Sequence, residues 1–181
     1  LDIGVAAPYN LSVTGHVTDA LTALAVDARV QVDDLQTAKI ADSLPVLTAN
    51  ADVAAKGPIN DLGVTLDADV DSQDYGRATL DGGVRYTPSQ VTIQALKLGV
   101  PATQGQLVAN GDVALAEGNA MDVTVDWQNL AWPLSAKPQY KSRKGRLALK
   151  GALSDYDLTT RLDWQVVGQT AGTLAAEGSG S

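Results

Sequence analysis

Hydrophobic and polar residues alternate along most of this chain with a period of two. In residues 121–128 the odd positions hold Met, Val, Val and Trp, and the even positions hold Asp, Thr, Asp and Gln. The same alternation covers residues 24–33, 62–70 and 158–166. A period of two with one apolar phase predicts β-strands that are half-buried.

The alternation favours antiparallel pairing, because parallel strands packed between helices are apolar on both faces. No stretch carries a helical stripe longer than two turns, and residues 35–44 are the one segment for which a short helix is expected. The sequence therefore predicts an all-β protein with an antiparallel or mixed sheet.

A degenerate repeat underlies the strands. The motif apolar-x-apolar-x-Gly-x-apolar is centred on positions 15, 82, 111 and 151, with weaker copies centred on positions 51, where alanine replaces glycine, and 178. The spacing of these six centres averages about 33 residues. Repeats of this length gain a core by stacking on their neighbours, so each is interpreted as about two strands of one continuous sheet.

Six such repeats give roughly 12 strands, more than the ~10 at which a twisted open sheet usually curls or splits. The sequence therefore predicts an elongated, curled sheet shaped like a taco, with a hydrophobic inner face. The small residues of the apolar phase give that face room for a ligand or for the other half of the sheet. The residues expected to line this groove are Val13, Val17, Leu80, Val84, Leu107, Val113, Val123, Val125, Trp127, Leu147, Leu149, Leu162, Trp164 and Val166.

Composition narrows the function more than it narrows the fold. The 181 residues include no cysteine and one histidine, His16. A metal site built from cysteine or histidine ligands is therefore not expected, and no cofactor is expected either. The formal net charge is −8, with 13 basic and 21 acidic side chains, which argues against binding to nucleic acid. Nearly half of the basic residues lie in residues 137–150, a cluster interpreted as a solvated strand face rather than an anion-binding patch.

Residues 106–167 resemble a known family. The segment Val125-Asp-Trp-Gln-Asn-Leu-Ala-Trp-Pro-Leu134 is the most specific part, and Gly145-Arg-Leu-Ala-Leu-Lys-Gly151 follows it. These motifs are similar to the TamB family, the large translocation-and-assembly-module subunits of Gram-negative bacteria, within the AsmA-like superfamily. The rest of the chain is similar to this family only in its short alternating strands and degenerate repeats.

The resemblance implies a periplasmic segment, residues 1–181, of a longer protein that is anchored in the inner membrane outside this segment. It also implies partnership with the outer-membrane barrel TamA, and clients that are phospholipids or unfolded outer-membrane proteins. The family supplies no catalytic residues. Residues 178–181 are interpreted in part as a linker tail.

Two other functions stay open from the sequence. One is a structural or adhesive β-repeat module of a secreted surface protein, with a closed core. The other is a polysaccharide-active enzyme, which would need paired carboxylates and exposed aromatic platforms. The chain has many aspartates but only three tryptophans and five tyrosines, so no enzymatic activity is expected.

Overall fold

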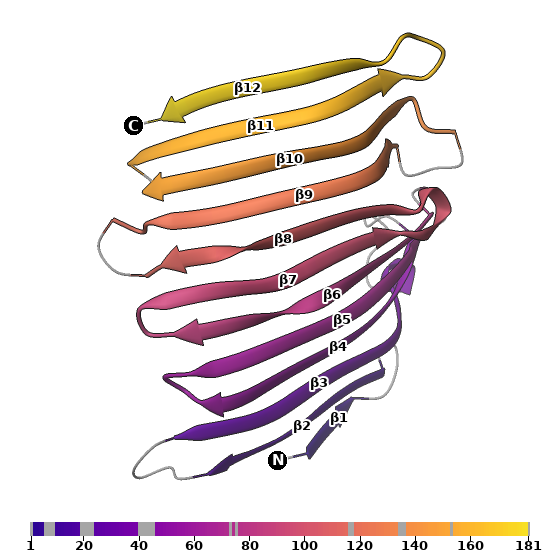
Figure 1. Cartoon of the computed structure of the whole chain (residues 1–181). Coiled ribbons are helices and arrows are strands. Elements are labelled where there is room, and N and C mark those ends of the chain that lie inside the picture. Colours follow the sequence, from indigo (N-terminus) through magenta and orange to yellow (C-terminus); the bar gives the residue numbers. More distant parts are fainter. Residues whose placement is uncertain are drawn as a thin grey trace.

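The computed structural model describes residues 2–5, 10–18, 24–39, 46–72, 74, 76–115, 118–133, 137–152 and 154–180. Twelve strands form a single sheet with the order β1 to β12 (Figure 1). The strands are β1 (Asp2–Val5), β2 (Asn10–Thr18), β3 (Ala25–Gln36), β4 (Leu47–Pro58), β5 (Leu62–Ser72), β6 (Gly76–Thr87), β7 (Gln90–Val100), β8 (Gly105–Ala114), β9 (Met121–Trp132), β10 (Tyr140–Ala152), β11 (Asp155–Val166) and β12 (Gly172–Gly180). The all-β prediction is confirmed.

Strands that are consecutive in the chain pair antiparallel with each other throughout the sheet. The sheet is therefore a continuous meander, and β1 and β12 form its two edges (Figure 1). β12 runs to Gly180, so most of the segment interpreted as a linker tail is strand; residue 181 lies outside the described residues.

The prediction that the sheet curls into a trough is wrong. Figure 1 shows a twisted sheet that is neither closed nor strongly curled. The prediction rested on strand number, but a large open sheet can take up its twist gradually from strand to strand.

Helical structure in the described residues is limited to two short 3₁₀ turns, Thr37–Lys39 and Pro101–Thr103. The helix expected at residues 35–44 is therefore not formed in its first half, where β3 continues to Gln36 and a single turn follows. Residues 40–45 lie outside the described residues. Strand pairing overrides the weak local pattern, because β3 gains partners on both sides.

Three strands contain a non-glycine residue with left-handed backbone, at Asp34 (φ 51°), Ala95 (φ 51°) and Asn129 (φ 50°). At the first two, the strand pairing shifts by one residue, which is the signature of a β-bulge. The freed backbone N–H of Asp34 donates to Asn50 Oδ1 at 2.8 Å, and that of Ala95 donates to Asn110 Oδ1 at 2.9 Å. The two bulges are thus held by the same asparagine contact in two separate strand pairs.

Few side chains in the described residues are fully buried. The buried apolar residues are Val100 and Ala131, and the buried polar residue is Ser72. Most other apolar residues on the strands are half-buried, because each is covered only by its neighbours on the same side of one sheet. The fold is therefore held mainly by ladder hydrogen bonds and cross-strand side-chain pairs rather than by a central core.

Candidate functional site

The register aligns apolar residues in rows that run across the sheet. Cross-strand partners lie on the same side of a sheet, so a chain of partners marks one side. The first such row consists of Leu11, Val32, Ala51, Ala68, Leu80, Leu98, Leu107, Trp127, Gly145, Leu162 and Leu174. It contains one residue from each strand from β2 to β12.

A second row runs parallel to the first. It consists of Gly15, Ala28, Ala55, Val64, Val84, Ile93, Gly111, Val123, Leu149, Leu158 and Gly178. We call the side of the sheet that carries these two rows the apolar side, and the opposite side the polar side.

The register brings the residues expected to line a groove onto the apolar side. Seven of them lie in the two rows, and Val125 is a direct partner of Leu147 between those rows. Val113 is a partner of Met121, and Val166 is a partner of Tyr140. Their role as a binding surface stays a prediction.

None of these predicted residues is fully buried. Val17 is 57% exposed and Trp164 is 44% exposed, and the other twelve are half-buried. Half-exposed apolar side chains in continuous rows are unlike a sealed core, whose residues lose nearly all contact with water. The two rows thus consist mainly of partly exposed apolar residues that neighbour one another across the strands.

Three aromatic rings on β9 and β11 lie over glycines on the next strand. A Cβ placed on Gly145 would lie 2.1 Å from Cζ2 of Trp127, its direct partner in the register. Trp164 covers Gly172 in the same way, and Tyr156 covers Gly180. Each glycine leaves the space in which a ring can lie flat against the neighbouring backbone. The indole Nε1–H of Trp127 also donates to Ser142 Oγ at 2.8 Å, which fixes the ring.

Exposed aromatic side chains gather where the β9–β10 and β11–β12 connections meet. Trp132 and Tyr140 are direct partners, and they are 58% and 53% exposed. The backbone N–H of Val167, itself an exposed residue, donates to the carbonyl of Gln139 at 2.8 Å, which holds the two connections together. β9 ends at Trp132, so its ring lies at the start of the β9–β10 connection.

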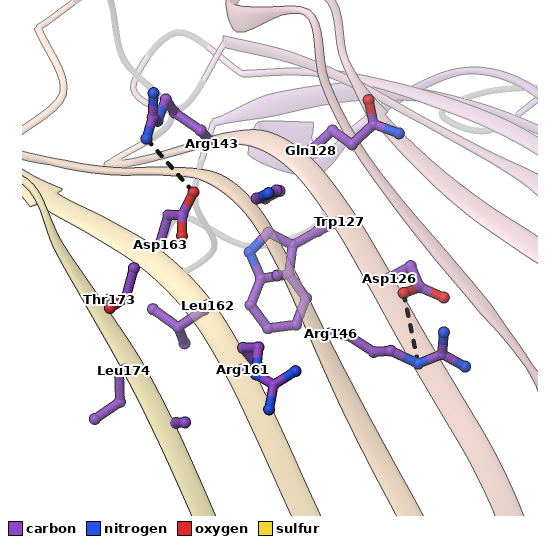
Figure 2. Close-up of a pocket in the computed structure, with 13 residues that line it drawn as sticks. Asp126, Trp127, Gln128, Arg143, Arg146, Arg161, Leu162, Asp163, Thr173 and Leu174 are labelled. Carbon is purple, nitrogen blue, oxygen red and sulfur yellow. Dashed lines mark ion pairs between the residues drawn. The ribbon is translucent and has the colours of Figure 1, made fainter.

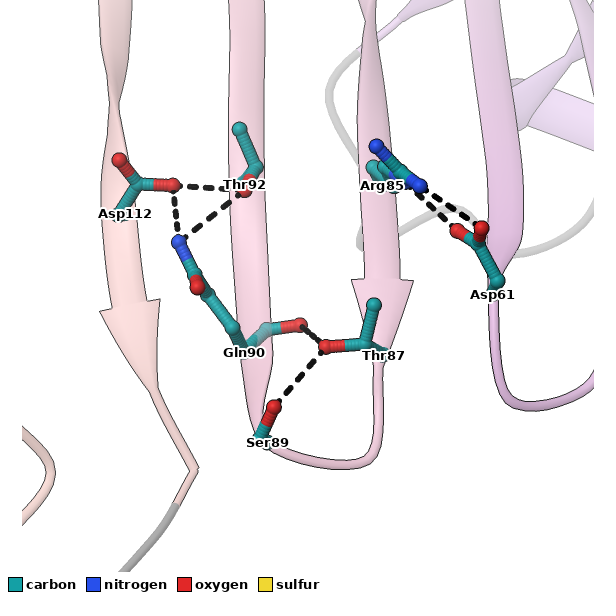
Figure 3. Close-up of polar contacts among 7 residues, drawn as sticks. All are labelled: Asp61, Arg85, Thr87, Ser89, Gln90, Thr92 and Asp112. Carbon is teal, nitrogen blue, oxygen red and sulfur yellow. Dashed lines mark hydrogen bonds and ion pairs between the residues drawn. The ribbon is translucent and has the colours of Figure 1, made fainter.

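The polar side is organised by hydrogen bonds and ion pairs between neighbouring strands (Figure 3). Asp112 accepts hydrogen bonds from Gln90 Nε2 at 2.5 Å and from Thr92 Oγ1 at 2.6 Å. Arg85 donates two hydrogen bonds to Asp61, at 2.6 and 2.7 Å. These contacts join side chains from adjacent strands or turns, so they reinforce the register of the sheet.

The arginine contacts shift the titration of two carboxyl groups. Hydrogen bonds from Arg29 hold the pKa of Asp52 below its ordinary value, and hydrogen bonds from Arg85 do the same for the pKa of Asp61. Desolvation opposes both shifts only in part. Lowered carboxyl pKa values of exposed ion pairs are typical of surface stabilisation and do not indicate a general acid or base.

An open hollow of about 750 Å³ lies over β9 to β12 (Figure 2). Many residues that line it are polar-side partners in the register: Asp126, Arg146, Arg161 and Ala175 form one row, and Asp163 is paired with Thr173. The lining also includes Trp127, Gly145, Leu162 and Leu174 of the first apolar row, so the hollow takes residues from both sides of the sheet, and its charged residues come from the polar side. Sequence reasoning missed Arg161, because it stands alone in the chain and joins the basic cluster of residues 137–150 only through strand pairing.

The described part of the chain contains no group of three or more His, Cys, Asp or Glu side chains placed to hold a metal ion. Within the same residues, no helix has the length and apolar character needed to cross a membrane.

Comparison with protein families matches residues 106–181 to the family described as TamB, N-terminal domain. The match includes the Trp127-to-Pro133 motif and the strands β9 to β12. Searches of curated proteins and of solved structures gave no significant match. The resemblance that the motifs of residues 106–167 predicted is therefore confirmed at the level of the family.

Proposed function

Residues 106–181 belong to the TamB family, and from this premise we propose that the chain is a segment of an outer-membrane assembly module whose apolar side shields hydrophobic clients in the periplasm. The TamB family takes part in outer-membrane assembly in the Gram-negative envelope, as a non-enzymatic module. The clients that fit the chemistry of the apolar side are phospholipid acyl chains and unfolded strands of outer-membrane proteins.

The observation that carries this proposal is the continuity of the apolar rows. A row of residues from β2 to β12 offers apolar contact along the whole width of the sheet, and its members are only half-covered. Each acyl methylene removed from water is worth ~0.8 kcal/mol, so a chain of a dozen carbons could be held without a specific polar pocket. An extended polypeptide strand could be held on the same surface by its apolar side chains.

The proposal extends to partners of the full-length protein. Family membership supports an association with the outer-membrane assembly machinery, and we propose the barrel TamA as the partner.

The alternative is a structural or adhesive module with a closed core. It would require an interior from which water is excluded, whereas the described apolar residues are almost all half-exposed. This observation supports the client-shielding function over the structural alternative.

The experiment places a carboxylate on the apolar side. On an open surface, Val125→Asp or Leu149→Asp leaves the sheet folded because the carboxylate can meet water, but it weakens client binding because a charge against an acyl chain costs several kcal/mol. Thr124→Asp is the matched control, since it adds the same charge on the polar side of the same strand. Circular dichroism and thermal melting report folding, and photo-crosslinking from Val123 and Leu162 to lipid vesicles reports binding.

We expect all three variants to keep the β-sheet spectrum, and only Val125→Asp and Leu149→Asp to lose crosslinked lipid. Unfolding of both apolar-side variants, together with no crosslink in the unchanged chain, would sink the proposal and favour the structural module. Retained crosslinking in both variants would show that a carboxylate on the apolar side does not weaken client binding, which would contradict the proposal.

A further inference from the structure

Several cations on the polar side stand opposite carboxylates. Lys56 lies across from Asp27 at 3.5 Å, and Lys150 lies across from Asp122 at 3.6 Å. Such pairs of opposite charge are the arrangement that stabilises a sheet, while like charges directly opposite each other destabilise it. Where two carboxylates are partners, as in β5 and β6, a cation such as Lys97 stands beside them on the next strand, 3.8 Å from Asp81.

One pair of partners on this side breaks the pattern with two cations. Arg146 of β10 stands directly opposite Arg161 of β11. The partner of Arg161 on its other side is Ala175, so β12 supplies no carboxylate at that position. Arg146 reaches Asp126 only at 3.8 Å, and Arg161 makes no ion pair with any residue that the structure describes.

The two arginines line the hollow over β9 to β12, together with Lys144 and Arg143 (Figure 2). Arg143 is held by Asp163 at 3.5 Å, and the side chain of Asp163 is the least exposed of the paired carboxylates, at 17%. The hollow thus gathers four cations and two carboxylates, although the chain as a whole carries a formal net charge of −8. A local excess of positive charge on an acidic chain marks a place where an anion is attracted.

We propose that Arg146 and Arg161, with Lys144 beside them, form a binding site for a phosphate group. A guanidinium donates two parallel hydrogen bonds to phosphate oxygens, and two opposed guanidinium groups can hold one phosphate between them. The bound anion also removes the repulsion between the two arginines. This site is on the opposite side of the sheet from the apolar rows, so it does not depend on the function proposed above.

The phosphate can be free in solution or part of a lipid headgroup, and two measurements separate these sources. Isothermal titration calorimetry of the 181-residue chain with inorganic phosphate, at low ionic strength, tests the free anion. Co-sedimentation with phosphatidylglycerol vesicles, compared with phosphatidylcholine vesicles, tests an anionic membrane surface. Each measurement is made on the unchanged chain, on Arg161→Gln and on Lys56→Gln, a control that removes the same charge from an ion-paired position on the polar side.

We expect Arg161→Gln to weaken binding at least tenfold and Lys56→Gln to change it by less than twofold. Arg161→Lys should lie between the unchanged chain and Arg161→Gln, because it keeps the charge but loses the paired donors. Without phosphate, Arg161→Gln should melt no lower than the unchanged chain, since it removes a repulsion. Added phosphate should raise the melting temperature of the unchanged chain and of Lys56→Gln, but not that of Arg161→Gln.

Binding of inorganic phosphate that needs Arg161 supports the site with the free anion as a sufficient ligand. Binding to phosphatidylglycerol vesicles alone, again lost in Arg161→Gln, supports the site with a lipid headgroup as its ligand. The proposal is overturned if neither probe binds, or if Arg161→Gln and Lys56→Gln weaken binding equally.

Discussion

The contact between Trp127 and Gly145 gives the most direct test of how this sheet is stabilised. In Gly145→Ala the new methyl group would lie 2.1 Å from Cζ2 and 2.3 Å from Cε2 of Trp127, and 2.8 Å from Cβ of Leu162. None of these distances is tolerated between carbon atoms, so the indole must move off the glycine. Moving it also breaks the hydrogen bond from Trp127 Nε1 to Ser142 Oγ.

The expected loss of stability follows from three contributions. Overpacking costs ~1–3 kcal/mol, and the loss of one hydrogen bond costs ~0.5–1.5 kcal/mol. Replacing glycine by alanine within a strand stabilises the folded state by ~0.5–1 kcal/mol, because the unfolded chain has less backbone entropy. The net effect should be a destabilisation of about 1–3 kcal/mol, or a melting temperature lower by about 2–10 °C for a chain of this size.

Thermal and urea unfolding followed by circular dichroism measures this effect. Gly178→Ala is the matched control, because it lies in an apolar row and its new methyl group would meet no atom within 4 Å. In the background of Trp127→Leu, which lacks the ring, Gly145→Ala should cost little. The reasoning is refuted if Gly145→Ala is as stable as Gly178→Ala, or if its cost is unchanged when Trp127 is absent.

Three further predictions concern shape, glycine conformation and pH. Twelve strands at ~4.8 Å spacing form a plate that spans roughly 53 Å, so small-angle scattering should give a radius of gyration near 19 Å, and a value near the ~16 Å of a compact chain would contradict the open sheet. Gly151→Leu should lower stability by ~1–3 kcal/mol, because Gly151 has φ 122° and a Cβ there would lie 2.4 Å from the carbonyl oxygen of Asp155. Lys150→Leu should be nearly neutral, and equal melting temperatures of the two variants would contradict this prediction. The lowered pKa of Asp52 contributes stability above the ordinary aspartate pKa, and this contribution is lost as the pH falls through the pKa of the folded state. The unchanged chain should therefore lose more stability on acidification below about pH 4 than Asp52→Asn does, as measured by thermal melts from pH 6 to 2.

The strands could be predicted from the sequence because the alternation in each is almost unbroken. The same alternation concealed the bulges, although a signal was present. Around Asp34, Ala95 and Asn129 the apolar residues are three positions apart instead of two, as in Val-Asp-Asp-Leu, Ile-Gln-Ala-Leu and Trp-Gln-Asn-Leu. An extra residue between two apolar ones keeps the second on the apolar side only if the strand bulges there.

The overall curvature could not be predicted, because it depends on the sum of small twists across eleven strand pairs and not on any local pattern. The phosphate site shows a second limit of prediction from the sequence. Residues 137–150 are visibly basic in the sequence, but three of their six cations, Arg143, Arg146 and Lys150, are matched by carboxylates on adjacent strands. Only the register reveals that Arg161 stands opposite Arg146 and has no carboxylate partner of its own among the described residues.

Because the strands pair in the order of the chain, the number of hairpins sets the width of the sheet. Since each strand pairs only with its neighbours in the chain, one hairpin can be inserted or removed without rethreading any other part, and the sheet then changes width by about two strand spacings, ~10 Å. A change by a whole hairpin also leaves the direction of every later strand and the side on which its apolar residues lie unchanged. Selection can therefore tune the reach of such a sheet in fixed steps by gain or loss of hairpins, while the surface that runs along it remains continuous.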